Sequence, residues 1–162
     1  MSFRIGIGFD LHRLGPNTPL VIGGVRIPHT MGLIGHSDGD VLCHAITDAL
    51  LGAAGIGNIG ELFPDTDPAL RGMSSLHFLE KSVALVRAKG FEIGNIDSNI
   101  LAERPKLLSF FPAMTSTMAE ALGITPDKIQ VKAKTMEGLG IVGTEQAIAA
   151  EAVALLVGGE QK

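Results

Sequence analysis

The sequence predicts a single two-layer α+β domain that spans residues 1–162. Three observations support this class: strand-like segments alternate with segments of helical periodicity, the chain has no internal repeat or low-complexity tract, and no long linker divides it. A chain of 162 residues can bury roughly two-thirds of its unfolded surface. Because aromatic residues make up only 4% of the chain, we expect a core of Ala, Val, Leu and Ile with seven Phe.

The chain is expected to begin with a strand and a β-hairpin. Residues 3–9 have a strand-like pattern, and residues 15–19 contain the glycine and prolines of a turn. Residues 20–27 then predict the hairpin, with Gly23 and Gly24 at or near its bend.

A helix is expected to begin after residues 36–40. Ser37 and Asp40 have the spacing of a variant capping box, and residues 41, 44, 45 and 48 follow at helical spacing. Glycines at positions 52, 55, 57 and 60 indicate that this helix gives way to a loop, which ends at residues 63–68.

A second helix is predicted over residues 75–89. Leu76, Leu79, Val83 and Val86 form one apolar stripe, and Gly90 is placed to end the helix in the left-handed conformation.

The rest of the chain combines strands with one more helix. Residues 91–102 and 129–135 predict strands, and residues 111–122 predict a helix. Residues 147–157 are ambiguous, because their alanines favour a helix while their position after another strand favours a strand. The expected architecture is a two-layer sandwich: a four-stranded mixed sheet with helices on one face, plus a small β-hairpin.

Composition narrows the classes of partner. The net charge is −4 and no run of basic residues is present, which argues against a nucleic-acid partner. The single cysteine, Cys43, fits a reducing compartment, and no stretch of about 18 residues is apolar enough to span a bilayer. We therefore expect a cytoplasmic protein without a membrane contact. The mean hydropathy of +0.33 has two explanations, an alanine-rich core or apolar surface buried between subunits.

The segment Asp10-Leu11-His12 is a candidate metal site. At the end of a strand, positions i and i+2 point to the same side, so a carboxylate and an imidazole converge. His44 is the best placed third ligand for a zinc-like ion, and Asp40 or Asp48 could orient its ring. The alternative is structural: Asp10 caps a turn, His12 is exposed and His44 is a core histidine.

Phosphate-binding groups are expected at the end of the strand over residues 129–135. Lys132 and Lys134 share one face, Thr135 follows, and Glu137 could meet phosphate through a divalent cation. Lys106, after the stiff Pro105, could add a further charge. A solvated strand face and an ordinary surface loop are the alternatives for these two segments.

Several segments, taken together and in order, resemble one known family. They are residues 8–12 (Gly-Phe-Asp-Leu-His), 22–25 (Ile-Gly-Gly-Val), 36–41 (His-Ser-Asp-Gly-Asp-Val), 63–67 (Phe-Pro-Asp-Thr-Asp), 105–106 (Pro-Lys) and 132–135 (Lys-Ala-Lys-Thr). The chain closely resembles the 2-C-methyl-D-erythritol 2,4-cyclodiphosphate synthases from start to finish, with no large insertion.

The resemblance implies a phosphorus–oxygen lyase of the non-mevalonate route to isoprenoid precursors. The substrate would be 4-diphosphocytidyl-2-C-methyl-D-erythritol 2-phosphate, and the products would be the 2,4-cyclodiphosphate and CMP. Family members are homotrimers with active sites between subunits. Two other functions remain open: a zinc phosphodiesterase acting on a nucleotide-linked diphosphate, and a non-catalytic, metal-stabilised trimer that binds nucleotides.

The resemblance also assigns roles to residues. Asp10, His12 and His44 match the family's zinc ligands, and Glu137 lies near a second ion, Mg²⁺ or Mn²⁺, that bridges the phosphates. His36 and Thr135 would assist the transition state. The implied substrate-binding residues are Ser37, Asn58, Ile59, Gly60, Phe63, Asp65, Asp67, Ala102, Pro105, Lys106, Leu107, Leu108, Lys134, Thr135, Met136 and Ile141.

Two positions depart from the family's pattern. Asn58 stands where the family commonly has an Asp associated with ribose hydroxyls. Thr144 stands where the family commonly has an arginine, in a Gly-Arg-x-Glu-Gly segment associated with the trimer's central channel and with isoprenoid diphosphate binding. We therefore expect downstream isoprenoid diphosphates to bind this chain weakly or not at all.

Overall fold

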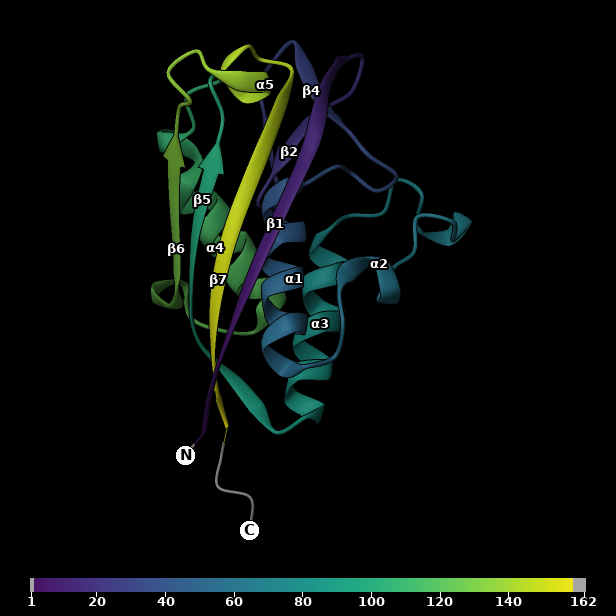
Figure 1. Ribbon diagram of the computed structural model, residues 1–162, viewed down its shortest axis with the longest axis vertical. Coiled ribbons are helices and arrows are strands. Elements are labelled where there is room, and N and C mark those ends of the chain that lie inside the picture. The colour runs from purple at the N-terminus through teal and green to yellow at the C-terminus, as the bar shows by residue number, and fades with distance from the viewer. Residues whose placement is uncertain (1, 159–162) are drawn as a thin grey trace.

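The computed structural model describes residues 2–158 and contains a five-stranded sheet with strand order β4-β1-β7-β5-β6 (Figure 1). All neighbouring strands are antiparallel except β5 and β6, which are parallel. The strands of this sheet are β1 (Ser2–Pro16), β4 (Met31–Ile34), β5 (Phe91–Leu101), β6 (Ile129–Lys134) and β7 (Ala147–Gly158). A separate hairpin consists of β2 (Leu20–Ile22) and β3 (Val25–Ile27).

Three helices cover one face of the sheet (Figure 1). They are α1 (Val41–Ala54), α3 (Leu76–Ala88) and α4 (Phe111–Leu122). The shorter helical elements are α2 (Ile59–Leu62), η1 (Pro68–Leu70), η2 (Leu108–Phe110), η3 (Pro126–Lys128) and α5 (Gly140–Gly143). The two-layer α+β prediction is therefore confirmed, as are the hairpin and the three long helices. Among residues 2–158, none of the helices is long and apolar enough to cross a membrane.

The expected number of strands was wrong by one. The sheet has a fifth strand, β4, which pairs with the end of β1 from Arg13 to Pro16. β1 thus continues through residues that have turn chemistry and ends at Pro16, beyond its pairing with β7, which ends at Arg13. The ambiguous segment 147–157 is strand β7, because it lies between β1 and β5 and pairs with both.

Two glycines on β1 let helix α1 lie directly on the sheet. A Cβ atom at Gly6 would lie 1.9 Å from the carbonyl oxygen of Ala49, and one at Gly8 would lie 1.9 Å from that of Ala45. Any side chain at these positions would therefore push the helix away. The close approach brings the later residues of β1 beside the first turns of α1, where the candidate metal ligands lie.

The opposite face of β1 is apolar, and no element within residues 2–158 covers it. Phe3, Ile5, Ile7 and Phe9 alternate with the buried or helix-facing positions, and their exposed fractions are 63%, 73%, 74% and 54%. Val153 on the neighbouring strand β7 is also exposed on this surface. Of the two explanations for the high mean hydropathy, this observation favours apolar surface that a subunit contact could bury.

Candidate metal centre

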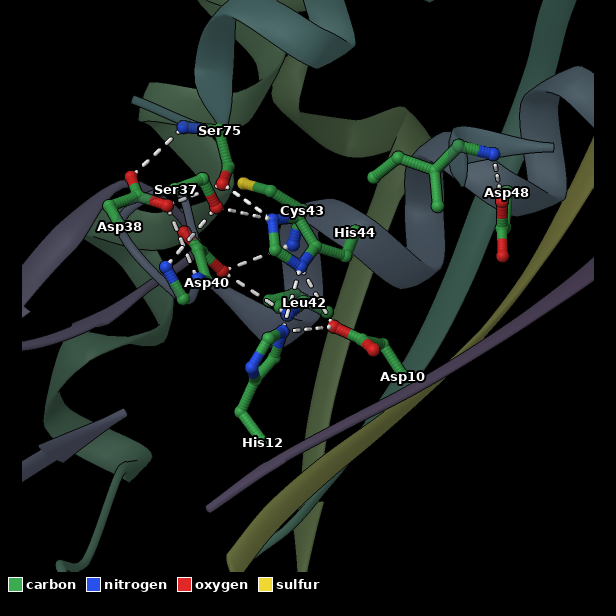
Figure 2. A network of polar contacts seen from close by, with 12 residues as sticks. Asp10, His12, Ser37, Asp38, Asp40, Leu42, Cys43, His44, Asp48 and Ser75 are labelled. Carbon is green, nitrogen blue, oxygen red and sulfur yellow. Dashed lines mark hydrogen bonds and ion pairs between the residues drawn. The ribbon is translucent and has the colours of Figure 1, made fainter. Parts of the chain in front are cut away.

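Three side chains from two elements meet at one point (Figure 2). Asp10 and His12 extend from the same side of β1, as their i, i+2 spacing predicts, and His44 extends from the first turn of α1. The Oδ2 atom of Asp10 lies 3.0 Å from Nε2 of His12 and 2.8 Å from Nδ1 of His44. The two imidazole nitrogens are 3.2 Å apart. Each residue thus offers one ligand atom to a common point.

The carboxylate of Asp10 is held in its ionised form. Burial alone would raise its pKa, but the hydrogen bonds and charges of His12 and His44 outweigh this effect and keep the pKa well below the usual value. The same hydrogen bond to Asp10 raises the pKa of His12, against the opposing effect of burial. The centre therefore carries a carboxylate under conditions in which His12 readily accepts a proton.

The outer nitrogen of each imidazole has a partner. Nδ1 of His12 lies 2.8 Å from the carbonyl oxygen of Ile34 on β4, so it carries the proton and leaves Nε2 free to bind a metal. Nε2 of His44 lies 2.8 Å from Oγ of Ser75 and 3.1 Å from Oγ of Ser37. Both contacts orient the rings, as outer partners of metal-binding histidines commonly do.

The predicted role of Asp40 or Asp48 as the partner of His44 is wrong. Asp40 is fully buried and accepts hydrogen bonds from the backbone N–H groups of residues 23, 24, 42 and 43. It is the N-cap of α1, so the predicted capping box with Ser37 as its first residue is also wrong. Asp48 accepts from the backbone N–H of Ile59. Both carboxylates are satisfied by backbone donors, which directs them away from the imidazole.

The donor set fits a divalent cation. One carboxylate oxygen and two imidazole nitrogens are the ligands that zinc and similar ions accept, and a catalytic zinc site takes three protein ligands. The orientation of His12 supports the fit independently, because its outer nitrogen is directed to the carbonyl of Ile34 and the neutral ring then leaves the inner nitrogen available to a metal ion. The structure therefore places Asp10, His12 and His44 close enough to bind a metal ion.

The centre opens into a pocket of about 420 Å³. Of the predicted residues, the pocket brings together the three ligands, His36, Ser37, Ile59, Gly60, Phe63 and Asp65. Nε2 of His36 contacts the carbonyl oxygen of Asp67 at 3.0 Å. Phe63 and Phe78 stack with their ring centroids 4.7 Å apart and form an aromatic wall beside His44.

Other predicted residues lie around a second pocket, of about 310 Å³, beside the ends of β5 and β6. Its lining includes Ala102, Pro105, Lys106, Leu107, Leu108, Lys134 and Thr135. In the adjoining loop, the hydroxyl of Thr135 donates to Glu137 at 2.7 Å. Lys132 instead forms an ion pair with Asp97, so only Lys134 of the two strand lysines lines this pocket.

Glu137 lines neither pocket, and neither do four of the predicted substrate-binding residues. Asn58 caps α2 and accepts from the backbone N–H of Glu61, and Asp67 caps η1. Met136 lies in the loop after β6, and Ile141 lines a separate hollow with Arg13 and Glu145. The second pocket is called the basic pocket below, for Lys106 and Lys134 in its lining. The two pockets share no lining residue, so within one chain the metal centre and the basic pocket are separate.

Sequence reasoning missed several residues of the centre. Ser75 contacts His44 but stands at the start of α3, where a serine is expected to cap the helix. Phe78 follows on the same helix, and its apolar character indicated only a core position. The carbonyl of Ile34 belongs to the strand that was not predicted.

The α+β fold carries a three-residue centre that could hold a metal ion at the mouth of a pocket, an arrangement typical of metal-dependent enzymes. The chain belongs to the YgbB family, whose model matches residues 3–157. It is 55% identical over 154 residues to the 2-C-methyl-D-erythritol 2,4-cyclodiphosphate synthase of Photorhabdus laumondii, covering 95% of this chain and 98% of that protein.

Solved structures agree with this relationship. The CDP complex of IspF from Plasmodium falciparum is 35% identical, with a TM-score of 0.86 over 98% of both chains. A CDP-bound form of 2C-methyl-D-erythritol-2,4-cyclodiphosphate synthase is 42% identical, with a TM-score of 0.87 over 95% of this chain and all of the other.

Proposed function

We propose that this chain converts 4-diphosphocytidyl-2-C-methyl-D-erythritol 2-phosphate to 2-C-methyl-D-erythritol 2,4-cyclodiphosphate and CMP, in the non-mevalonate route to isoprenoid precursors. The convergence of Asp10, His12 and His44 beside a pocket carries the proposal, in a chain closely related to named synthases over almost its whole length. The activity is that of a phosphorus–oxygen lyase. An oxygen of the 2-phosphate bonds to the β-phosphorus, the bond from that phosphorus to the bridging oxygen breaks, and CMP leaves with the bridging oxygen.

The chemistry calls for positioning and charge neutralisation. An ionised phosphate is already a nucleophile, so no general base is needed, but two anions must approach each other. Asp10, His12 and His44 would hold one divalent cation, for which we propose Zn²⁺, and Glu137 would help to hold a second, Mg²⁺ or Mn²⁺. When bound, such cations neutralise and polarise the phosphates.

The protein's own side chains would orient the substrate around these charges. His36 and Thr135 would donate hydrogen bonds to oxygens that gain charge in the transition state. Ser37 and Asp65 line the pocket beside the centre and would contact the methylerythritol. Lys106 and Lys134 line the basic pocket and would contact the nucleotide and the diphosphate.

We further propose a homotrimer with active sites between subunits. A substrate with a nucleotide at one end and a sugar phosphate at the other must reach both a metal centre and a basic pocket, which do not share a wall in one chain. Association would let the pocket of one subunit face the centre of the next. The exposed apolar face of β1 supports association, because apolar surfaces of this kind are normally buried between subunits. The proposed location is cytoplasmic, with which the buried free thiol of Cys43 is compatible.

Phosphorus NMR of the reaction mixture tests the proposed reaction. The expected result is a cyclic diphosphate and CMP in equal amounts, formed only when a divalent cation is present. A ring-opened monoester would support the phosphodiesterase instead. Absence of turnover, with CMP binding retained in both the natural protein and His12→Ala, would support a non-catalytic nucleotide-binding trimer.

Thr144, which replaces the arginine common in the family, supports a separate proposal. We propose that isoprenoid diphosphates bind this chain weakly or not at all. The hydroxyl of Thr144 donates to the carbonyl of Gly140 at 2.8 Å and accepts from Gln146 at 2.9 Å, so its bonding capacity is used locally. A neutral hydroxyl also lacks the charge that an arginine would offer a diphosphate. Calorimetric titration with farnesyl diphosphate should show no tight binding, and a submicromolar Kd would contradict the proposal.

A further inference from the structure

The outer nitrogen of His44 begins a chain of hydrogen bonds that leads away from the metal centre (Figure 2). Nε2 of His44 lies 2.8 Å from the hydroxyl oxygen of Ser75, and that hydroxyl also contacts Oδ1 of Asp38. Asp38 receives a second bond from the backbone N–H of Ser75, at 2.9 Å to Oδ2. Ser75 is completely buried.

The helical position of Ser75 shows that its side chain is not used in the ordinary way. Ser75 is the N-cap of α3, where a serine normally accepts a hydrogen bond from the first turn, yet its side chain makes no capping bond. The hydroxyl is directed toward Asp38 and His44 instead. A structural role in starting the helix therefore does not account for this geometry.

The direction of each proton in the chain follows from the donors available. An ionised carboxylate can only accept, and a serine hydroxyl has one proton to donate. Since Asp38 takes the proton of Ser75, the oxygen of Ser75 must accept from Nε2 of His44. His44 therefore carries a proton on Nε2, so in the neutral ring Nδ1, which faces Asp10 and His12, is the nitrogen left to bind a metal ion.

The contacts of Ser37 determine the position of the His44 proton less clearly than those of Ser75. Its oxygen lies 3.1 Å from Nε2 of His44 and 3.3 Å from the backbone nitrogen of Gly39, so it can accept from both. Its own proton is not directed to Asp38 by any contact of the described residues 2–158. Ser37 can thus share the Nε2 proton, while Ser75, anchored by a carboxylate, determines where that proton resides.

We propose that Asp38 and Ser75 are positioning residues of the metal centre, which act through His44. They select the imidazole form whose Nδ1 binds the cation, and they hold the ring in its binding orientation. The arrangement is a carboxylate–serine–histidine relay, in place of the direct carboxylate–histidine contact often found around zinc. The inference deepens the proposed function through its metal centre, but metal binding can be measured without substrate.

The test compares two buried serines, one at the N-cap of α3 and one within the helix. Ser75→Ala removes the relay, whereas Ser82→Ala removes a buried hydroxyl that has no hydrogen-bond partner among residues 2–158. Zinc affinity of the chelator-treated protein is measured by competition with a chromogenic chelator. We expect Ser75→Ala to raise the zinc Kd about 10–100-fold, the usual effect of losing an outer partner. Ser82→Ala should leave it unchanged, and Ser75→Thr, which keeps a hydroxyl, should restore most of the affinity.

A spectroscopic measurement on the unaltered protein makes the inference independent of variant folding. In protein labelled with ¹⁵N-histidine and loaded with zinc, the His44 ring should show a slowly exchanging proton on Nε2 and a metal-bound Nδ1. Zinc bound through Nε2 would overturn the proposal, as would natural zinc affinity in Ser75→Ala or an equal loss in Ser82→Ala. If zinc binds as expected but no cyclic product forms, the proposed reaction fails while the relay stands.

Discussion

The metal centre and the basic pocket differ in how much of each site a single chain completes. At the metal centre, contacts within the chain orient Asp10, His12 and His44, and the backbone carbonyl of Ile34 fixes one imidazole. At the basic pocket, Lys134 and Lys106 are exposed. The comparison teaches that one folded chain completes the arrangement that could bind a metal ion, whereas nucleotide binding is expected to need a wall from a neighbouring subunit.

The loop beside the basic pocket is nevertheless held in place through its backbone. Glu103 accepts hydrogen bonds from the N–H groups of Met136 and Gly138, at 3.2 and 3.4 Å. Glu137, between them, adopts a left-handed conformation with φ of 52°. These contacts thus fix the backbone of the loop but leave its side chains exposed. Exposed side chains are available to contact a substrate and a neighbouring subunit.

The largest effect is expected from removing a metal ligand. His44→Ala deletes one of three ligand atoms and leaves the carboxylate of Asp10 with one histidine. Since losing an outer partner already costs about 10–100-fold in affinity, zinc affinity should fall by more than about 100-fold, and turnover with it. Competition with a chelator measures the first effect, and phosphorus NMR measures the second.

His77→Ala is the matched control for that experiment. His77 lies on α3 beside Glu80, outside the pocket, so its loss should change neither quantity. If His44→Ala retained natural zinc affinity, the three side chains would not form the metal site. The contrast between the metal centre and the basic pocket would then be wrong.

The second largest effect is expected from a substitution that tests the close approach of α1 to β1. Gly8→Ala places a Cβ against the backbone of Ala45, which cannot yield without moving the helix. We expect the free energy of unfolding to fall by about 3 kcal/mol, at the upper end for overpacked cores, and zinc affinity to fall because His44 moves with the helix. Urea denaturation of the zinc-free protein measures the first quantity.

Gly52→Ala provides the opposite case in the same helix. A Cβ atom at Gly52 would meet nothing within 4 Å, so alanine should stabilise the helix by about 0.5–1 kcal/mol through its better propensity. Equal destabilisation by both substitutions would show that the contact at Gly8 does not determine how the helix sits.

The ligands could be predicted from sequence because each follows from local geometry. Asp10 and His12 share a side through the period of a strand, and His44 lies on the first turn of a helix whose start the sequence indicates. Ser75 could not be predicted. It is 31 residues from His44, and its position at a helix start predicts a cap; only the packing of α3 against α1 reveals its other use.

The fold was predictable to the same extent and for the same reason. Helix α3 has a clear stripe and a glycine stop, and it forms where expected. Strand β4 has four residues, too few to show an alternation, and exists because β1 offers an edge. In β7, pairing with strands on both sides outweighs the helix propensity of the alanines, which is a tertiary effect.

A smaller effect is expected at the basic pocket. Lys134→Ala removes a charge that lines this pocket and should weaken CDP binding about tenfold, or about 1.4 kcal/mol, because a charged hydrogen bond to phosphate is lost. Lys132→Ala, two residues earlier on the same strand, removes an ammonium group already paired with Asp97 and should change CDP affinity little. Calorimetry measures both, and zinc affinity should be unchanged in each. An equal loss in the two variants would mean that the face of β6, rather than the pocket, binds the nucleotide.

The smallest effect is a pH dependence confined to the metal centre. The pKa of His12 is raised above 6.5 in the zinc-free protein, chiefly by its hydrogen bond to Asp10. Protonated His12 therefore stabilises the zinc-free fold below pH 6.5, and this stabilisation is lost as the pH rises through the folded pKa. Zinc requires the unprotonated ring, so zinc affinity should change in the opposite sense and rise with pH over the same window.

Asp10 should not contribute to this profile. Its lowered pKa means that its stabilising effect is present above pH 3.8 and is lost only as the pH falls through the folded pKa, well below the window in which His12 titrates. Release of the His12 proton alone gives a slope of less than tenfold in zinc affinity per pH unit, which levels off above the folded pKa. Chelator competition from pH 6 to 9 measures the slope, and CDP affinity of the zinc-free protein should not follow it. A zinc affinity that stays flat from pH 6 to 9 would show that His12 binds zinc without losing a proton. The hydrogen bond to Asp10 would then not raise the pKa of His12.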